Sequence, residues 1–202
     1  MPDFLHEDAA RRGGARIVAG LDEVGRGPWA GPVVAACVVL DPGLVPDGLD
    51  DSKKLSAARR EGLFERLRNC AWIGIGEASV AEIDDMNILQ ASFLAMRRAL
   101  DDLPIVPDHL LVDGRQIPAG LPCPSEAVIK GDALSLSIAA ASIVAKVTRD
   151  RLMVTLAQQH PHYGWETNMG YGTARHQLGL KSHGVTPHHR RSFRPIHNIL
   201  YQ

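Results

Sequence analysis

The spacing of apolar residues along the chain predicts an alternation of strands and helices. Short runs of branched apolar residues, bounded by Gly, Pro or acidic side chains, are typical of strands. Such runs occupy residues 17–22, 33–40, 72–75, 109–112 and 127–129. Longer stretches with helical spacing lie at residues 56–70, 79–100 and 135–159. Two strands followed by alternating helices and strands predict an α/β fold in which helices flank a mixed sheet.

The stretch 79–100 predicts one continuous amphipathic helix. Ser79 and Glu82 form a capping-box pattern at its start. Apolar residues then recur at helical spacing, at Ile83, Met86, Leu89, Phe93, Met96 and Leu100. This spacing places them on one face, which we expect to be buried.

Length and composition are those of an ordinary globular chain. With 202 residues, 45% hydrophobic and 22% charged, the sequence can bury a core of its own and is not disordered throughout. The amino terminus lacks the apolar core of a signal peptide, and no later run reaches the length of a membrane span, so we expect a cytoplasmic protein. Cys37, Cys70 and Cys123 lie far apart without paired spacing, and we interpret them as small buried hydrophobic residues.

The formal net charge of −1 conceals an uneven distribution. Residues 133–202 hold eight Lys or Arg against two acids, together with seven of the nine His. The remainder holds fourteen bases against twenty-one acids. An acidic body with a basic carboxy-terminal part favours contact with a polyanion, although a solvated basic face without a partner explains the same composition.

Acidic residues follow several of the predicted strands. Asp22, Glu23 and Asp113 fall at strand exits, and Asp132 lies just before a predicted helix. Ligand sites in open α/β sheets form at the carboxyl ends of strands, so the four carboxylates converge if these strands are neighbours. Clustered carboxylates resist ionisation unless a cation lies among them, and hard oxygen ligands select Mg²⁺ or Mn²⁺. The pattern therefore indicates a divalent-metal site.

A structural explanation stays open for each acid taken alone. Asp113 precedes a glycine and Asp132 follows one, and an acid in such a place is often a helix cap or a turn residue. For Asp22 and Glu23 the alternative is an exposed turn. That alternative explains neither their adjacency nor the neighbouring Gly25-Arg26-Gly27.

A series of motifs runs through most of the chain in a fixed order. They are DEVGRGPWAGP at 22–32, DSKKLS at 51–56, LLVDG at 110–114, KGDA at 130–133, SIAAASIVAKVTRD at 137–150, GYGT at 170–173 and HHRRSF at 188–193. Together they resemble the ribonuclease HII family over residues 17–193. Any one motif is weak, but their joint occurrence in this order is highly specific.

The resemblance implies a fold of the ribonuclease H type: a catalytic domain over residues 1–160, with a helical, basic segment over 161–202 packed on it. It implies a monomeric endonuclease that hydrolyses the RNA strand of RNA/DNA hybrids and cuts at ribonucleotides embedded in duplex DNA. The implied mechanism uses two divalent ions, Mg²⁺ or Mn²⁺, and leaves 3′-hydroxyl and 5′-phosphate ends.

The same resemblance assigns roles to individual residues. The metal-binding and catalytic acids it implies are Asp22, Glu23, Asp113 and Asp132. The substrate contacts it implies are Gly25, Arg26, Gly27, Tyr171, Lys53, Lys54 and Lys146. The glycine turn would read the 2′-hydroxyl, Arg26 would meet a phosphate, and Tyr171 would pack on the sugar of the next deoxynucleotide. Taken without the family, the turn is an ordinary tight turn, Tyr171 is a loop anchor and the lysines are solvated.

The chain also departs from the family pattern. Met169 precedes GYGT where a lysine is common, which puts one phosphate contact in doubt, and Trp29 replaces a frequent leucine as a packing variation. Residues 188–191 either track the nucleic-acid backbone or cap a helix end. Residues 177–180 faintly resemble a sliding-clamp-binding pattern but are better interpreted as a helix surface.

Two other functions compete with the ribonuclease. A catalytically silent hybrid-binding module would not need all four acids. A phosphohydrolase for small molecules would need neither Gly25-Arg26-Gly27, nor Tyr171, nor the basic carboxy-terminal part.

Overall fold

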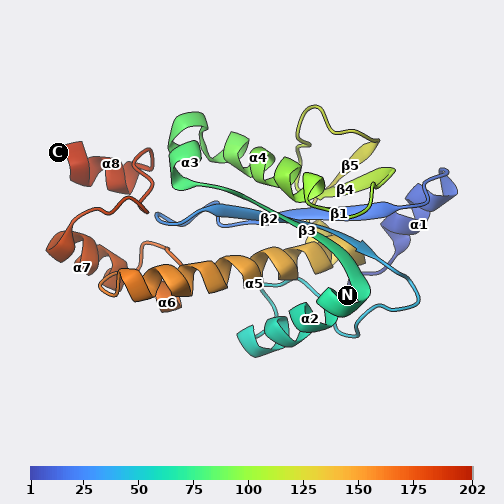
Figure 1. Ribbon diagram of the computed structural model, residues 1–202, viewed down its shortest axis with the longest axis horizontal. Helices are drawn as coiled ribbons and strands as arrows, with labels where there is room; N and C mark the ends of the chain where they lie inside the picture. Colours follow the sequence, from blue (N-terminus) through green and yellow to red (C-terminus); the bar gives the residue numbers. More distant parts are fainter. Residues whose placement is uncertain (202) are drawn as a thin grey trace.

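The computed structural model describes residues 1–201, which form a sheet covered by helices on both faces (Figure 1). The sheet order is β3-β2-β1-β4-β5. The strands are β1 (Val18–Val24), β2 (Val33–Leu40), β3 (Ala71–Ala78), β4 (His109–Asp113) and β5 (Ser125–Val128). The pairs β1–β2 and β2–β3 are antiparallel, whereas β1–β4 and β4–β5 are parallel. The mixed sheet predicted from the sequence is therefore confirmed.

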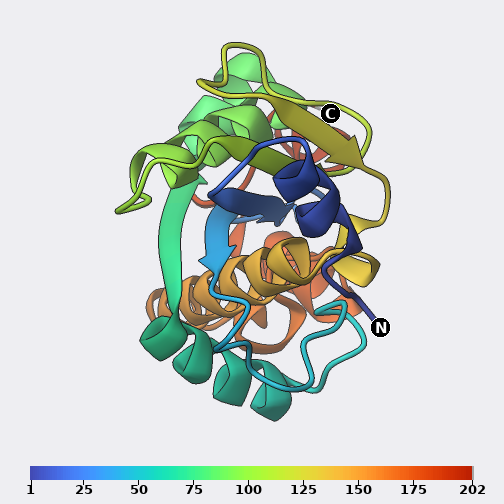
Figure 2. The ribbon, with the colours of Figure 1, turned by 90° about the vertical axis from the view of Figure 1, so that its right-hand side faces the viewer.

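Helices fill both layers and both ends of the molecule. They are α1 (Leu5–Arg12), α2 (Ala57–Cys70), α3 (Val80–Met86), α4 (Ile88–Asp101), the 3₁₀ turn η1 (Gly131–Ala133), α5 (Leu136–Gln159), α6 (Trp165–Asn168), α7 (Ala174–His183) and α8 (Arg194–Tyr201). Figure 2 shows α3 and α4 on one side of the sheet and α5 with α2 on the other. None of the helices in residues 1–201 is long and apolar enough to cross a membrane.

Strand β2 shows why both faces are covered. All eight of its residues are buried, and alternate side chains enter different clusters. Val33, Ala35 and Cys37 pack on the face that carries α4, whereas Ala36 and Val38 pack with residues of α2 and α5. A continuous apolar strand of this kind has no solvent-facing side, so it lies in the interior of a sheet between two helical layers.

Glycine lets the long helix approach the sheet closely. A Cβ on Gly20 of β1 would overlap the backbone of Ser137 in α5. On the other face, side chains at Gly74 and Gly76 of β3 would overlap the backbone of α4. The small residues therefore set the distance between the layers, and α5 is held against the strand that carries Asp22.

The single helix predicted over residues 79–100 is wrong: the structure has two helices there. The chain turns at Asn87, whose φ is +73°, and the Asn87 side chain accepts hydrogen bonds from the N–H groups of Leu89 and Gln90 at the start of α4. The capping box of Ser79 and Glu82 is confirmed at the start of α3. One left-handed residue redirects the chain without interrupting the apolar periodicity, so the pattern did not show the break.

The segment after residue 160 packs on the end of α5 and on the loop between β1 and β2 (Figure 1). A third apolar cluster joins Ala30 of that loop and Met153 of α5 to Trp165, Leu180 and Ile196. The predicted division at residue 160 stays a prediction, and its last residue, Gln202, lies outside the described residues.

The three cysteines are free, and only one is buried. Cys37 lies in β2 and is buried, as predicted, whereas Cys70 and Cys123 are half-buried. The prediction that all three are buried is therefore wrong for the latter two, because Cys70 ends α2 and Cys123 precedes β5, where the chain reaches the surface.

Candidate active site

Two neighbouring parallel strands bring Asp22 and Asp113 together. Leu21 of β1 is paired with Val112 of β4, so the next residue on each strand is one of these acids. Both strands point the same way, and their carboxyl ends meet at the same edge of the sheet.

The turn after β5 places Asp132 beside Asp113. The N–H of Gly131 donates a hydrogen bond of 2.7 Å to Oδ1 of Asp113, which fixes the start of η1 beside the end of β4. Asp132 is the next residue and is buried, with 6% of its surface exposed. Gly131 is tightly enclosed, since a Cβ there would approach Asp113 to 3.3 Å. The structure thus gathers all four predicted acids at one site.

Burial and crowding make ionisation of Asp22, Glu23 and Asp113 unfavourable. Burial raises the pKa of the Asp22 carboxyl well above its ordinary value, and the neighbouring carboxylates, with Glu23 first, raise it further. Burial also raises the pKa of Glu23, against the opposing effect of the Arg26 cation. The pKa of Asp113 is raised by burial too, although the Gly131 N–H opposes the shift. The site therefore favours added positive charge.

Two of the acids form ion pairs with basic side chains. Nη1 of Arg26 lies 3.2 Å from Oε1 of Glu23, and Nζ of Lys53 lies 3.2 Å from Oδ2 of Asp132. Burial lowers the pKa of the Lys53 ammonium, but the acid cluster, Asp132 foremost, outweighs this and raises it. Both cationic side chains are substantially exposed, so each can turn away from its carboxylate.

The side chains of the four acids have the right ligand chemistry for a divalent cation, but they do not form a complete coordination site in the structure. Within residues 1–201, no three His, Cys, Asp or Glu side chains are arranged to hold a metal ion as they stand. The donors are nevertheless all carboxylate oxygens, which suit Mg²⁺ and Mn²⁺. Because Arg26 and Lys53 already contact Glu23 and Asp132, these two carboxylates are turned towards nitrogen atoms. The four carboxylates are nevertheless near enough to interact, since Glu23, Asp113 and Asp132 each raise the pKa of Asp22.

The glycine turn lies directly beside Tyr171. A Cβ on Gly27 would be 3.3 Å from Cε1 of the Tyr171 ring. Gly25 has a φ of +97°, a left-handed conformation that suits glycine, and a side chain there would overlap Arg149. Tyr171 has 49% of its surface exposed, so its ring faces solvent next to the turn. The predicted turn and tyrosine therefore form one surface, although they are far apart in sequence.

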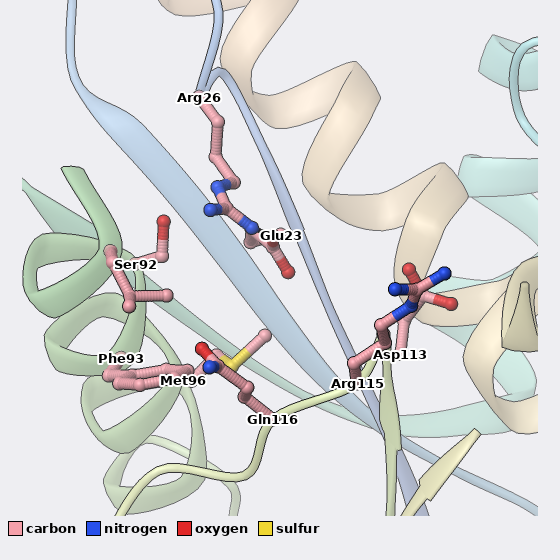
Figure 3. Close-up of a pocket in the computed structure, with 10 residues that line it drawn as sticks. Glu23, Arg26, Ser92, Phe93, Met96, Asp113, Arg115 and Gln116 are labelled. Carbon is pink, nitrogen blue, oxygen red and sulfur yellow. Dashed lines mark hydrogen bonds and ion pairs between the residues drawn. The ribbon is translucent and has the colours of Figure 1, made fainter. Parts of the chain in front are cut away.

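A pocket of about 390 Å³ opens between the ends of β1 and β4 and helix α4 (Figure 3). Glu23, Arg26 and Asp113 form its polar side, and Phe93 and Met96 line the α4 side. Arg115 and Gln116, which follow Asp113, also border it. Arg115 and Gln116 were not predicted as site residues from the sequence. Their position directly after the LLVDG motif was the available signal.

The three predicted lysines do not share one place. Only Lys53 contacts an acid of the cluster. Nζ of Lys54 pairs with Asp50 at 3.2 Å, and Nζ of Lys146 pairs with Asp150 at 2.7 Å. A phosphate-binding role for Lys54 and Lys146 stays a prediction, and each would first have to leave its carboxylate.

The expectation that residues 188–191 track a nucleic-acid backbone or cap a helix end does not fit His189 and Arg190. Both are buried, with 1% and 0% of their surface exposed, and their polar groups bond to other residues of the chain. Arg191 is exposed, and its main-chain N–H donates to Asp84. The charged run looked like a solvated face, but it is partly interior because main-chain carbonyls satisfy the Arg190 guanidinium.

Met169 and Trp29 both pack against the third apolar cluster. Met169 is left-handed, with φ +50°, and its side chain packs against the third apolar cluster. Trp29 packs against the same cluster and lies so close to Gly172 that a Cβ there would overlap the indole. The interpretation of Trp29 as a packing residue agrees with this position. Residues 177–180 lie within helix α7, as expected, but only Gln177 and Leu178 are on its surface, since Gly179 and Leu180 are buried.

A mixed sheet that gathers four carboxylates where β1, β4 and β5 end, beside a partly exposed glycine turn, defines a nuclease of the ribonuclease H type. The description "Ribonuclease HII" belongs to the family model that matches residues 19–196. A ribonuclease HII of Ruegeria pomeroyi is 65% identical over 201 residues, which span 100% of this chain and 86% of the relative. One of Cereibacter sphaeroides is 62% identical, and the match covers 100% of this chain and 95% of the relative.

Solved structures agree with these sequence matches. The ribonuclease H2 from Pyrococcus horikoshii OT3 superimposes with a TM-score of 0.77 at 30% identity, covering 91% of this chain and 97% of that one. The ribonuclease HII in a complex with PCNA from Archaeoglobus fulgidus gives a TM-score of 0.74 at 28% identity, covering 89% of this chain and 96% of that one.

The chain belongs to the ribonuclease HII family. It is a divalent-metal-dependent hydrolase that cleaves RNA phosphodiester bonds within RNA/DNA hybrids, with the ribonuclease H-like fold that the motifs implied.

Proposed function

We propose that the chain cuts both RNA/DNA hybrids and DNA duplexes that contain embedded ribonucleotides, acting as a monomer with Mg²⁺ or Mn²⁺ held by Asp22, Glu23, Asp113 and Asp132. The products carry 3′-hydroxyl and 5′-phosphate ends. The convergence of these four carboxylates in one buried, charge-strained site carries the proposal.

Divalent ions at such a site lower the pKa of an attacking water and stabilise the charge on the departing 3′-oxygen. The chain's own residues hold and orient the ligand oxygens. The Gly131 N–H fixes Oδ1 of Asp113, and the N–H of Glu23 donates to Oδ1 of Asp22 at 2.7 Å. These main-chain donors leave the second oxygen of each carboxylate available to a cation.

The exposed cations beside the acids suit a phosphodiester substrate. Arg26 and Lys53 reach the site from the glycine turn and from the loop before α2, respectively, and contact the acids only through their terminal nitrogens. Because both side chains are exposed, they would be able to turn from the acids and neutralise phosphate oxygens of a bound strand. Such contacts position the nucleic acid without reading its sequence.

The glycine turn and Tyr171 supply the selection for ribose. Gly27 is exposed beside Tyr171 and carries no side chain, so the backbone there can approach a sugar, and the 2′-hydroxyl distinguishes RNA from DNA at that place. Tyr171 adjoins Gly27 and exposes its ring, so it can pack on the sugar that follows the ribonucleotide. This arrangement favours junction recognition over a preference for long hybrids alone.

The test is cleavage of a labelled DNA duplex that contains one ribonucleotide, beside an all-DNA duplex of the same sequence. We expect one cut next to the ribonucleotide with Mg²⁺ or Mn²⁺, no cut with a chelator, and a 5′-phosphate on the downstream product. An intact ribonucleotide-containing strand, under conditions in which a simple RNA/DNA hybrid is cut, would refute the embedded-ribonucleotide activity.

A further inference from the structure

Two buried arginines lie beneath the glycine turn. Arg149 and Arg190 have 1% and 0% of their surface exposed, and every hydrogen bond recorded for their guanidinium groups runs to a main-chain carbonyl. Burial lowers the pKa of Arg190 to about 9 and that of Arg149 to about 10. A buried cation is costly unless its donors are satisfied, so an arrangement that satisfies both with carbonyls indicates a specific role.

The Arg190 guanidinium donates hydrogen bonds to the main chain of the glycine turn. Its Nη2 donates to the carbonyl of Gly25 at 2.6 Å, and its Nη1 donates to the carbonyl of Arg26 at 3.0 Å. Nε and Nη2 also donate to the carbonyl of Gly31, at 3.0 and 2.8 Å. The planar guanidinium presents its donors in a fixed fork, so one side chain from the end of the chain defines the orientation of several turn peptides.

The orientation of those carbonyls determines what the turn presents outwards. In a planar trans peptide, the C=O and the following N–H point in opposite directions. Because Arg190 holds the carbonyls of Gly25 and Arg26 inwards, the N–H groups of Arg26 and Gly27 point away from the protein interior. These are the donors on the side of the turn opposite the buried guanidinium.

We propose that Arg190 is a positioning residue for ribonucleotide selection. Its guanidinium fixes the Gly25 and Arg26 peptides so that the following amides face the sugar of the substrate. The proposal rests on the proposed function of the glycine turn. It makes the carboxy-terminal segment part of substrate discrimination although Arg190 never touches the substrate.

The contacts of Arg149 differ from those of Arg190 at the glycine turn, although both guanidinium groups donate to the carbonyl of Pro32. The Arg149 guanidinium donates to the carbonyls of Pro32, Met169 and Ala30, at 2.9, 2.9 and 3.0 Å. Arg149 therefore links the end of the β1–β2 loop, at Ala30 and Pro32, to Met169. It makes no hydrogen bond to the carbonyls of Gly25 or Arg26. The peptides next to the proposed 2′-hydroxyl contact depend on Arg190.

The experiment measures discrimination in binding, using the full chain with Asp113→Asn to prevent cleavage. Fluorescence anisotropy gives the Kd for a DNA duplex with one ribonucleotide and for the matching all-DNA duplex. Adding Arg190→Lys removes the fork but keeps the charge. The ratio of the two Kd values should fall by about tenfold, the effect expected for a lost charge-assisted hydrogen bond.

A matched variant separates positioning from folding. Leu180→Ala opens a cavity in the third apolar cluster without touching the turn, and it should lower the melting temperature while keeping the Kd ratio. If Arg190→Lys does not fold at the assay temperature, the same ratio is measured with Arg190→Gln, which keeps one donor without the buried charge, and the same fall is expected.

The outcomes are distinguishable. A folded Arg190 variant with the parental ratio would overturn the positioning role and leave the proposed function intact. A ratio near one in the parent itself would refute selection by the glycine turn, and with it the role of Arg190.

Discussion

The main-chain N–H of Gly131 donates a 2.7 Å hydrogen bond to the carboxylate of Asp113, and this contact joins two segments that carry acids of the site. It places Asp132 next to the end of β4, while the pairing of β1 with β4 places Asp22 on the other side. The main-chain geometry thus brings the acids together, and their mutual repulsion destabilises the folded state.

Removing one of these charges should stabilise the protein while it inactivates the enzyme. The pKa of Asp22 is raised in the fold, so its ionised form destabilises the native state above the folded pKa. We expect Asp22→Asn to melt at a higher temperature than the parent at pH 7 in a chelator, and to show no cleavage. The gain in melting temperature should shrink as the pH falls through the folded pKa towards the unfolded one, because the native state then binds a proton that relieves the strain. Calorimetry over this pH range checks it, and an equal or lower melting temperature at pH 7 would be inconsistent with strain at this site.

Tyr171 should contribute to recognition more than to stability. Its ring is half exposed and adjoins Gly27, so Tyr171→Ala removes a substrate contact without opening a core cavity. We expect kcat/KM on a single-ribonucleotide duplex to fall by about tenfold, in keeping with the loss of one aromatic packing contact. Tyr171→Phe keeps the ring and serves as the control. Parental kinetics in the alanine variant would contradict the assignment.

A buried histidine pair should make the carboxy-terminal segment sensitive to acid. Nε2 of His176 lies 3.0 Å from Nε2 of His189, and Nδ1 of His189 accepts from the N–H of Thr186. Burial lowers the pKa of His189 from 6.5 to about 3 and also lowers that of His176. The neutral rings stabilise the fold fully above pH 6.5, and this contribution is lost as the pH falls from 6.5 towards about 3, because the unfolded state then binds more protons.

His189→Asn, which keeps an acceptor for the Thr186 N–H but cannot titrate, tests this. We expect urea denaturation to give a lower free energy of unfolding at pH 7.5 for the variant, and a smaller decline for it than for the parent between pH 6.5 and 5. Parallel declines would show that the histidine pair does not cause the acid sensitivity.

Two glycine-to-alanine substitutions should have opposite effects. Gly20→Ala places a Cβ into the backbone of Ser137, so we expect a loss of about 3 kcal/mol or more in the free energy of unfolding. Gly62→Ala lies on the exposed face of α2 with nothing within 4 Å, and it should stabilise the helix by about 1 kcal/mol. Urea denaturation measures both. A stable Gly20 variant would mean that the gap between β1 and α5 is not fixed by this residue.

The apolar runs predicted the five strands, most clearly β2 and β4, whose apolar side chains are buried; β5 gave the weakest signal, since only Val128 in it is buried. They placed Asp113 at a strand end but could not place β4 beside β1, since parallel pairing depends on a crossover through distant residues. Asn87 was missed because the helix after it resumes with its apolar face still buried.

Arg190 shows a different limit of the sequence. A charged run is ordinarily solvated, and nothing local to residues 188–191 shows that carbonyls of Gly25 and Arg26 will enclose one member of it. The partners lie more than 160 positions away, and only the folded chain brings them together.

The most direct test of the central claim is single-turnover cleavage of an RNA/DNA hybrid by Asp113→Asn and Asp132→Asn, measured beside the parent and Asp101→Asn at saturating Mg²⁺ and Mn²⁺. Asp101 is an exposed acid at the end of α4 and controls for loss of charge alone. We expect the parent and the Asp101 variant to cut at equal rates, and both site variants to fold normally without detectable product. Cleavage at the parental rate by either site variant would contradict a divalent-metal site built from these carboxylates.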